Sequence, residues 1–277
     1  MLDIFIIVNA VILGLLVGSF LNVVALRFNT GKSLGGRSGC YSCGHQLSWY
    51  ELVPLFSWLI QKGRCRSCGS HISSLYITGE LTVGIFYGLI AARGIIAGFD
   101  WFSVSYGIST LFLFVIFSIL AVILMYDVRH KIIPDSLSLA FGLMSFLGMF
   151  FFGFDTGVFN YIGFHIPDMW HMLGGVLVPL PFVVLWLVSK GRWLGLGDPK
   201  LMVGMGFLFG TTQGFTSVFV SFWIGALFAL SIFLVNFFLK KQLLRTGKKS
   251  IMKEELPFAP FLIIATLITV VFNINLF

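Results

Sequence analysis

Eight apolar runs divide this chain, and most of them are long enough to cross a lipid bilayer. They lie near residues 4–26, 75–97, 101–125, 136–152, 171–189, 201–212, 215–239 and 257–277. A transmembrane helix needs about 20 mainly apolar residues, so 201–212 is short. Because 58% of the residues are hydrophobic and only 10% are charged, a soluble fold of this length could not bury the apolar surface. The sequence predicts an all-α polytopic membrane protein with about eight transmembrane helices.

The basic residues predict how the chain is oriented. If the N-terminus lies outside, the cytoplasmic segments are 27–74, 126–135, 190–200 and 240–256, which hold 17 of the 18 Lys and Arg residues. Only Arg93 falls near the outer side. This distribution follows the positive-inside rule and predicts that both termini lie outside. No tract interleaves basic with aromatic residues as a nucleic-acid groove would, so we expect no nucleic-acid partner.

The beginning of the chain and the stretch after the first run define its expected domains. Asp3 and the absence of a positive leading segment indicate that the first run is a retained span, not a cleaved signal peptide. Residues 27–74 contain no span-length apolar run. We therefore expect a first transmembrane helix (1–26), a small cytoplasmic domain (27–74) and a transmembrane core (75–277).

The cytoplasmic domain holds all four cysteines of the chain, arranged as two Cys-x-x-Cys pairs separated by 21 residues. They are Cys40, Cys43, Cys65 and Cys68. Two such pairs can hold one Zn²⁺ tetrahedrally, which leaves no open position for water and makes the site structural. Disulfides and a redox dithiol are the alternatives, although a reducing compartment disfavours disulfides. A further alternative replaces one cysteine ligand with His45 or His71.

Two aspartates carry the strongest chemical signal. Asp127 ends the third run, and Asp198 precedes the sixth within Gly195-Leu-Gly197-Asp198. The expected topology sets both at the cytoplasmic edge of the membrane, where ionisable groups are costly and usually functional. Two close carboxylates share one proton, so one can activate water while the other polarises a carbonyl. Glycine at 195 and 197 would let an extended substrate approach the backbone.

Simpler roles compete with catalysis at these acids. Each aspartate could cap a helix or pair with a nearby cation, namely Arg129, Lys131, Lys190 or Lys200. For Asp135, which follows a proline, helix capping is the favoured interpretation. Glu80, inside the second run, either makes an interhelical hydrogen bond or lines a substrate or methyl-donor cavity. Pro257 opens the last run and could shape the wall of the same cleft, or simply begin a helix.

The ordered motifs of this chain resemble those of the type IV prepilin peptidases, the bacterial branch of the GxGD aspartyl proteases. In order they are Gly18-Ser-Phe-Leu-Asn22, the double Cys-x-x-Cys insert with Leu52-Val-Pro54-Leu-Phe-Ser-Trp58, Gly63-Arg-Cys-Arg66, Gly79-Glu80, Asp127 with Ile133-Pro-Asp135, Gly195-Leu-Gly-Asp198-Pro-Lys200 and Leu256-Pro-Phe-Ala-Pro260. A lone GxGD would be weak evidence, whereas this ordered set is specific.

The resemblance implies an aspartic endopeptidase of the bacterial inner membrane. Its substrates would be prepilin-like proteins that have a basic leader and a hydrophobic N-terminal helix. Asp127 and Asp198 would be the catalytic pair, and Glu80, Gly195, Gly197, Lys200 and Pro257 would line the substrate or cofactor cavity. The resemblance also implies N-methylation of the new terminus from S-adenosylmethionine. The sequence contains no nucleotide-binding glycine motif that would indicate methyl transfer independently.

Two other functions remain open at this point. Tyr126-Asp127 and the GxGD motif also resemble presenilin and signal-peptide-peptidase enzymes, which lack the double Cys-x-x-Cys insert. A proton-coupled transporter could use Asp127, Asp198 and Glu80 as a relay, but these acids gather at one face of the membrane.

Overall fold

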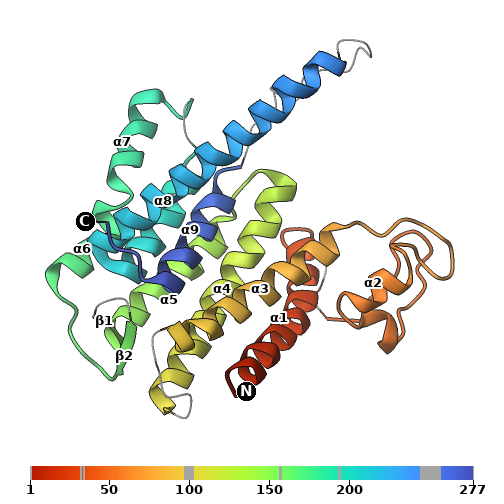
Figure 1. The fold of residues 1–277 in the computed structure, drawn as a ribbon, viewed down its shortest axis with the longest axis horizontal. Helices are drawn as coiled ribbons and strands as arrows, with labels where there is room; N and C mark the ends of the chain where they lie inside the picture. The colour runs from red at the N-terminus through yellow and green to blue at the C-terminus, as the bar shows by residue number, and fades with distance from the viewer. Residues whose placement is uncertain are drawn as a thin grey trace.

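The computed structural model describes residues 2–31, 33, 35–96, 103–155, 158–192, 195–243 and 257–276. Its elements in chain order are α1 (Leu2–Arg27), the 3₁₀ helix η1 (Trp49–Leu52), α2 (Phe56–Ile60), α3 (Leu75–Ile96), α4 (Val104–His130), α5 (Asp135–Phe151), β1 (Phe152–Asp155), β2 (Val158–Ile162), α6 (Met169–Leu177), α7 (Leu180–Ser189), α8 (Gly197–Leu243) and α9 (Ala259–Phe272). The expected cytoplasmic segment 240–256 lies, from residue 244 onward, outside the described residues. Among these residues the fold is helical (Figure 1), apart from one antiparallel hairpin of β1 and β2 in the loop that follows the fourth apolar run.

Five helical segments within the described residues are long and apolar enough to cross a membrane. They are Leu2–Arg27, Leu75–Gly94, Val104–His130, Met169–Ser189 and Gly197–Val235. Helices α5 and α9 are also apolar but shorter, with 17 and 14 residues. The expectation of a multi-helix membrane protein is therefore confirmed, whereas helix length alone does not give the expected count of eight spans.

Helix α8 is interrupted at Gly210, whose φ of 76° and ψ of −169° are not helical. A Cβ atom on Gly214 would lie 3.5 Å from the Cα atom of Gly206. In a straight helix these residues would be about 12 Å apart along the axis. The chain therefore turns back at Gly210, and α8 consists of two arms, 197–210 and 211–243. These arms correspond to the sixth and seventh apolar runs. The sequence placed the boundary between the runs at 212–215, a few residues after the observed break at Gly210.

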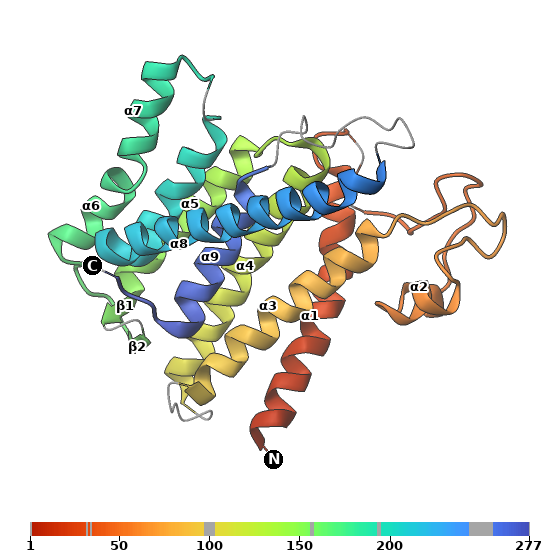
Figure 2. The same cartoon turned by 45° about the horizontal axis from the view of Figure 1, so that its top comes forward.

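Helix α4 lies at the centre of the bundle, in contact with α1, α3, α5 and α9. Figures 1 and 2 show it flanked by these helices in both views. Ile116, Leu120, Ile123 and Asp127 recur at helical spacing along its buried side, and the three apolar members are almost completely buried. Asp127 thus lies on the same buried side of α4 as these apolar residues. It is in the last turn of the helix, on the side near Asp198 of α8.

Close packing through glycine joins α1 to α3. A Cβ atom on Gly18 would lie 2.9 Å from the Cα atom of Glu80, and one on Gly14 would lie 2.8 Å from the Cα atom of Gly84. Small residues let membrane helices approach this closely. The side-chain amide of Asn22 then donates a hydrogen bond to the carbonyl oxygen of Tyr76 (2.8 Å). This packing sets the position of the segment between the two helices, which extends sideways from the bundle in Figure 2.

Candidate active site and cysteine cluster

Asp127 and Asp198 lie where one helix ends and another begins. Asp127 lies in the last turn of α4 and is 4% exposed, and Asp198 lies half-buried in the first turn of α8. The two carboxylates are close enough to interact electrostatically. Helix α4 stops just after Asp127 because Lys131 adopts a left-handed conformation, and its N–H donates to the carbonyl oxygen of Asp127 (2.7 Å). The structure therefore brings together the two acids that the sequence places at one depth.

Two contacts hold the loops of these aspartates against each other. A Cβ atom on Gly197 would lie 3.1 Å from the side chain of Ile133, so the residue before Asp198 packs on the turn that follows α4. Gly195, in contrast, faces open space. The ammonium group of Lys200 donates to a carboxylate oxygen of Asp135 across 2.6 Å, which links α8 to the start of α5.

The chemistry available to this pair follows from its burial. Among the described residues, the Oδ2 atom of Asp127 is buried and has no hydrogen-bond partner. A buried carboxylate that lacks a partner is costly unless it is protonated or shares a proton with its neighbour. Two adjacent carboxylates that share one proton can act together as a base and an acid.

The residues around the aspartate pair include one that was expected to cap a helix. Asp135 does not cap α5, because Pro134 occupies the N-cap position and the carboxylate pairs with Lys200 instead. Gly195, Gly197 and Lys200 flank Asp198 along the chain, and their expected place in a substrate or cofactor cavity stays a prediction. Pro257 precedes α9 by two residues, and the neighbouring Phe258 packs against Phe222 at 4.9 Å between ring centroids.

Of the two roles left open for Glu80, the contacts agree with the interhelical hydrogen bond, and a place in a substrate or methyl-donor cavity stays a prediction. Its buried carboxylate accepts a hydrogen bond from the backbone N–H of Leu55 (2.8 Å) and another from the side chain of Ser19. Leu55 has a φ of 60° and a ψ of −54°, and the N–H of Phe56 donates to the carbonyl oxygen of Pro54 (2.6 Å). This is a γ-turn of the rare positive-φ form, which is strained for leucine. Glu80 therefore fastens a strained turn of the inserted segment to α1 and α3.

The four cysteines form one cluster, in which all four Sγ atoms lie within 4.8 Å of one another. The Sγ atoms of Cys40 and Cys68 are 3.8 Å apart. Tetrahedral zinc with Zn–S bonds of about 2.3 Å requires sulfur atoms about 3.8 Å apart. The cysteines are not joined by disulfides. The expected four-cysteine grouping is therefore confirmed, and its geometry fits a metal ion of the size and preference of Zn²⁺.

Two equivalent backbone turns carry these thiols, which we call the cysteine module (residues 36–72). In the first, the N–H of Cys40 donates to the oxygen of His45 and the N–H of Gly44 donates back to Cys40, both at 2.9 Å. Cys65, Ser70 and Gly69 repeat the same two bonds at the same length. Both glycines have a φ near 70° (72° and 69°), which other residues adopt only with strain. The repeated turn explains why the two sequence motifs look alike.

The module also favours the thiolate form that a metal requires. A hydrogen bond with the hydroxyl of Ser70 is the main cause that lowers the pKa of Cys40 from 9.0 to about 5, and it also lowers the pKa of Cys68. A backbone hydrogen bond from His45 lowers the pKa of Cys43, but burial and the other cysteines outweigh it and raise this pKa to about 11. The hydroxyl of Ser70 therefore favours the thiolate form of two of the four cysteines, which is the form that binds a metal ion.

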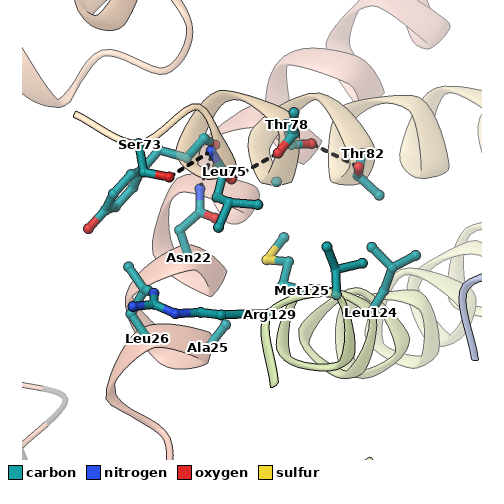
Figure 3. A pocket seen from close by; sticks show the side chains of 13 residues that line it. Asn22, Ala25, Leu26, Ser73, Leu75, Thr78, Thr82, Leu124, Met125 and Arg129 are labelled. Carbon is teal, nitrogen blue, oxygen red and sulfur yellow. Dashed lines mark hydrogen bonds between the residues drawn. The ribbon is translucent and has the colours of Figure 1, made fainter. Parts of the chain in front are cut away.

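A separate cavity of about 300 Å³ lies between the end of α1, the start of α3 and the end of α4, as Figure 3 shows. Its lining is mostly apolar, and the polar side chains include Asn22, Thr78 and Arg129. A helix turns by about 100° per residue, so the residues of α4 that line the cavity lie on a different face from Asp127. Arg129 forms no ion pair with any described residue. Sequence reasoning did not find this cavity, because its lining comes from three helices far apart in the chain.

Fold and site together define a helical, multi-pass membrane protein with a four-cysteine module and a pair of aspartates, one buried and one half-buried. The model of the bacterial peptidase A24 N-terminal domain matches residues 12–93, and that of the type IV leader peptidase family matches residues 114–230. The first region contains the cysteine module and the second contains both aspartates. The chain belongs to the type IV leader peptidase family.

Relatives share this similarity along most of the chain. A protein of Bacillus subtilis is 31% identical over 90% of this chain and 87% of its own length, and one of Stutzerimonas stutzeri is 30% identical over 92% and 87%. A protein of Myxococcus xanthus is 34% identical over 70% of this chain, but the match spans only 53% of that protein. All three are named prepilin leader peptidase/N-methyltransferase. No solved structure matches the chain. The presenilin-like and transporter alternatives are not favoured.

Proposed function

We propose that this protein cleaves the leader peptide of prepilin-like proteins at the membrane surface and methylates the new N-terminus. The observation that carries the peptidase function is the electrostatically coupled pair of buried Asp127 and half-buried Asp198, which lies inside the region that matches the family. The test is incubation of the purified protein in detergent with a prepilin-like substrate, followed by mass analysis of the products. Release of the leader by the unaltered protein, but not by variants of either aspartate, would support it.

The two aspartates would divide the hydrolysis between them. The charged carboxylate takes a proton from a water molecule, and the resulting hydroxide adds to the carbonyl carbon of the scissile peptide bond. The protonated carboxyl group donates a hydrogen bond to the carbonyl oxygen as negative charge develops there. The amine then leaves with a proton from the pair. Because Gly195 faces open space beside Asp198, an extended peptide could lie against this loop.

The substrate chemistry follows from the position of the pair. A hydrophobic segment after the cleavage site would remain in the bilayer, and a basic leader before it would remain on the cytoplasmic side with the anionic lipids. Membrane lipids are therefore partners as well as solvent. The pair lies at the ends of helices, so the cut would fall at the boundary between these two parts of the substrate.

We infer that the cysteine cluster holds one structural Zn²⁺. Cys40, Cys43, Cys65 and Cys68 would bind it through their sulfur atoms, in agreement with their spacing and with the lowered pKa of two thiols. Four protein ligands leave no position for a reacting water, so the ion would supply folding energy and no catalysis.

Methylation would use the cavity between α1, α3 and α4. S-adenosylmethionine supplies the methyl group, and its carboxylate is complementary to the guanidinium of Arg129, which otherwise has no ion-pair partner among the described residues. The apolar lining suits the adenine ring. Since this cavity and Asp127 lie on different faces of α4, peptide cleavage and methyl transfer would occur at separate sites.

Arg129→Gln is expected to weaken use of the methyl donor while leader cleavage continues. Loss of one charge-assisted hydrogen bond at a solvent-accessible site should raise the KM for S-adenosylmethionine about tenfold. The measurement is methylation of a peptide already cut at its N-terminus, alongside cleavage of the intact substrate. Arg37→Gln, an equivalent change at an exposed residue of the cysteine module, is the matched control. An equal loss of both activities in Arg129→Gln would contradict a separate donor site.

We propose that both termini lie outside, as the positions of the basic residues support. Reporter fusions or impermeant labelling should place Arg64, His130 and Lys190 in the cytoplasm, and Phe159 outside, because basic loops resist translocation. If a reporter that works only in the cytoplasm is active when fused after Phe159, the orientation is the reverse of the proposed one, and the aspartates do not lie on the cytoplasmic side.

A further inference from the structure

The cysteine module exposes large apolar side chains although it lies outside the transmembrane helices. Trp49 is 80% exposed, Ile60 72%, Phe56 63% and Leu59 57%. Phe56, Leu59 and Ile60 are spaced i, i+3, i+4, so they share one face of α2. We call these four residues the apolar edge. Soluble surfaces rarely expose such a group of aromatic and aliphatic side chains unless it contacts a membrane or a partner.

The exposed charges around the apolar edge have one sign. Lys62, Arg64 and Arg66 follow α2 directly and are all exposed. The only acid between residues 27 and 74 is Glu51, which is 6% exposed and accepts a hydrogen bond from the N–H of Ser48 (2.9 Å). The module therefore presents positive charge beside apolar surface, with no exposed acid, which is complementary to an anionic lipid surface.

The attachment of the module sets its depth. The hydrogen bond between the N–H of Leu55 and Glu80 holds the start of α2 beside the second turn of α3. Glu80 lies five residues into α3, so this contact is about 8 Å along the helix from its cytoplasmic end. In Figure 2 α2 lies at the side of the bundle, near the first turns of α3, and not above the helix ends.

We propose that the apolar edge inserts into the headgroup–acyl boundary of the bilayer and that Lys62, Arg64 and Arg66 bind anionic lipid headgroups. An interfacial segment lies about 5–10 Å deep in this boundary, which matches the depth set by Glu80. The module is connected to α1 at one end and to α3 at the other. Because both helices span the membrane, the bilayer is the apolar phase closest to α2. The hydrogen bond between Glu80 and Leu55 then limits how deeply α2 inserts, and α2 lies in the plane of the membrane surface. This inference depends on membrane insertion of the chain and not on its peptidase activity.

Tryptophan quenching by brominated lipids tests this proposal on the full-length, metal-loaded protein in nanodiscs. The signal of Trp49 is the difference in emission between the unaltered protein and Trp49→Phe. We expect lipids brominated near the headgroup end of the acyl chain to reduce this difference by about half or more, since an interfacial ring contacts that region. Leu59→Ser combined with Ile60→Ser should weaken the quenching, whereas Ser57→Ala, on another face of α2, should not. Metal content verifies folding of each variant.

The lipid headgroup provides the second arm of the test. Quenching should be stronger in nanodiscs that contain phosphatidylglycerol than in pure phosphatidylcholine, and Lys62→Gln combined with Arg66→Gln should reduce that preference. Equal quenching in both bilayers would overturn the assignment of the basic residues to headgroups. Emission from Trp49 that brominated lipid does not change would overturn insertion. Protection of the apolar edge only after addition of a prepilin-like peptide would overturn the lipid assignment and identify it as a substrate surface.

Discussion

Replacing either Asp127 or Asp198 with asparagine is expected to reduce leader cleavage by roughly 10³–10⁴-fold. An amide cannot take the proton from water, and it cannot share a proton with the remaining carboxylate. The side chains are nearly isosteric, and the change removes charge from a buried (Asp127) or half-buried (Asp198) position, so the fold should persist. Rates on a prepilin-like substrate in detergent give the effect of each variant. The double variant should be little worse than either single one, because the two groups act as a unit.

Asp168→Asn is the matched control for these substitutions. Asp168 caps α6, where its carboxylate accepts a hydrogen bond from the N–H of His171 (3.1 Å), and asparagine caps a helix equally well. This variant should cleave at the normal rate. The catalytic variants should still methylate a pre-cut peptide, since methyl transfer to an amine needs no water-activating pair. Substantial cleavage by either Asn variant would refute the aspartyl mechanism, and loss of both activities in a folded variant would indicate one shared site.

Removing a ligand from the cysteine cluster is expected to abolish metal binding. The purified protein should contain about one zinc per chain, and Cys40→Ser or Cys68→Ser should reduce this to near zero after dialysis, because a structural zinc site depends on all four ligands. The module is too small to fold on an apolar core, so hydrogen exchange across residues 36–72 should rise steeply. Exchange in α4 and the first arm of α8 should change little, because the module is attached through α1 and α3.

Ser67→Ala is the internal control, because Ser67 lies between Cys65 and Cys68 and is exposed. It should retain the metal and the protection of the module. Cleavage should also survive mild chelation better than in a metalloprotease, since the ion performs no chemistry. A metal-free protein whose cysteines are oxidised in pairs would contradict the zinc assignment. Unchanged hydrogen exchange in the Cys40→Ser variant would show that the module folds without metal.

Several features of this protein could be predicted from local sequence because they depend on short-range chemistry. The apolar runs give the membrane helices, since lipid requires every backbone group to be bonded within its own helix. The cysteine spacing gives the metal-type cluster because each pair and its glycine form one tight turn. The common depth of Asp127 and Asp198 follows from counting spans and basic loops.

Other expectations depended on which helices become neighbours, and there the sequence was incomplete or wrong. Asp135 was expected to cap a helix, but Lys200 reaches it from α8 and forms an ion pair. For Glu80 the sequence left a hydrogen bond and a cavity lining open, and it did not reveal that the N–H of Leu55 is a partner of its carboxylate. Neither partner is near in sequence, so no local pattern could reveal these pairs.

The sequence by itself determined that the chain is a multi-helix membrane protein and that four cysteines gather on a small insert, and it predicted that two aspartates lie at one edge of the bilayer. Only the tertiary structure decided that these aspartates interact, that a separate cavity lies on another face of α4 and that Glu80 holds the insert beside α3. Hydrophobic periodicity and charge determine whether a segment lies in lipid or in water, because the free energy of that transfer depends only on the residues of the segment itself. Close packing through glycines such as Gly18 and Gly197 fixes which segments touch, because it depends on the shapes of two surfaces at once.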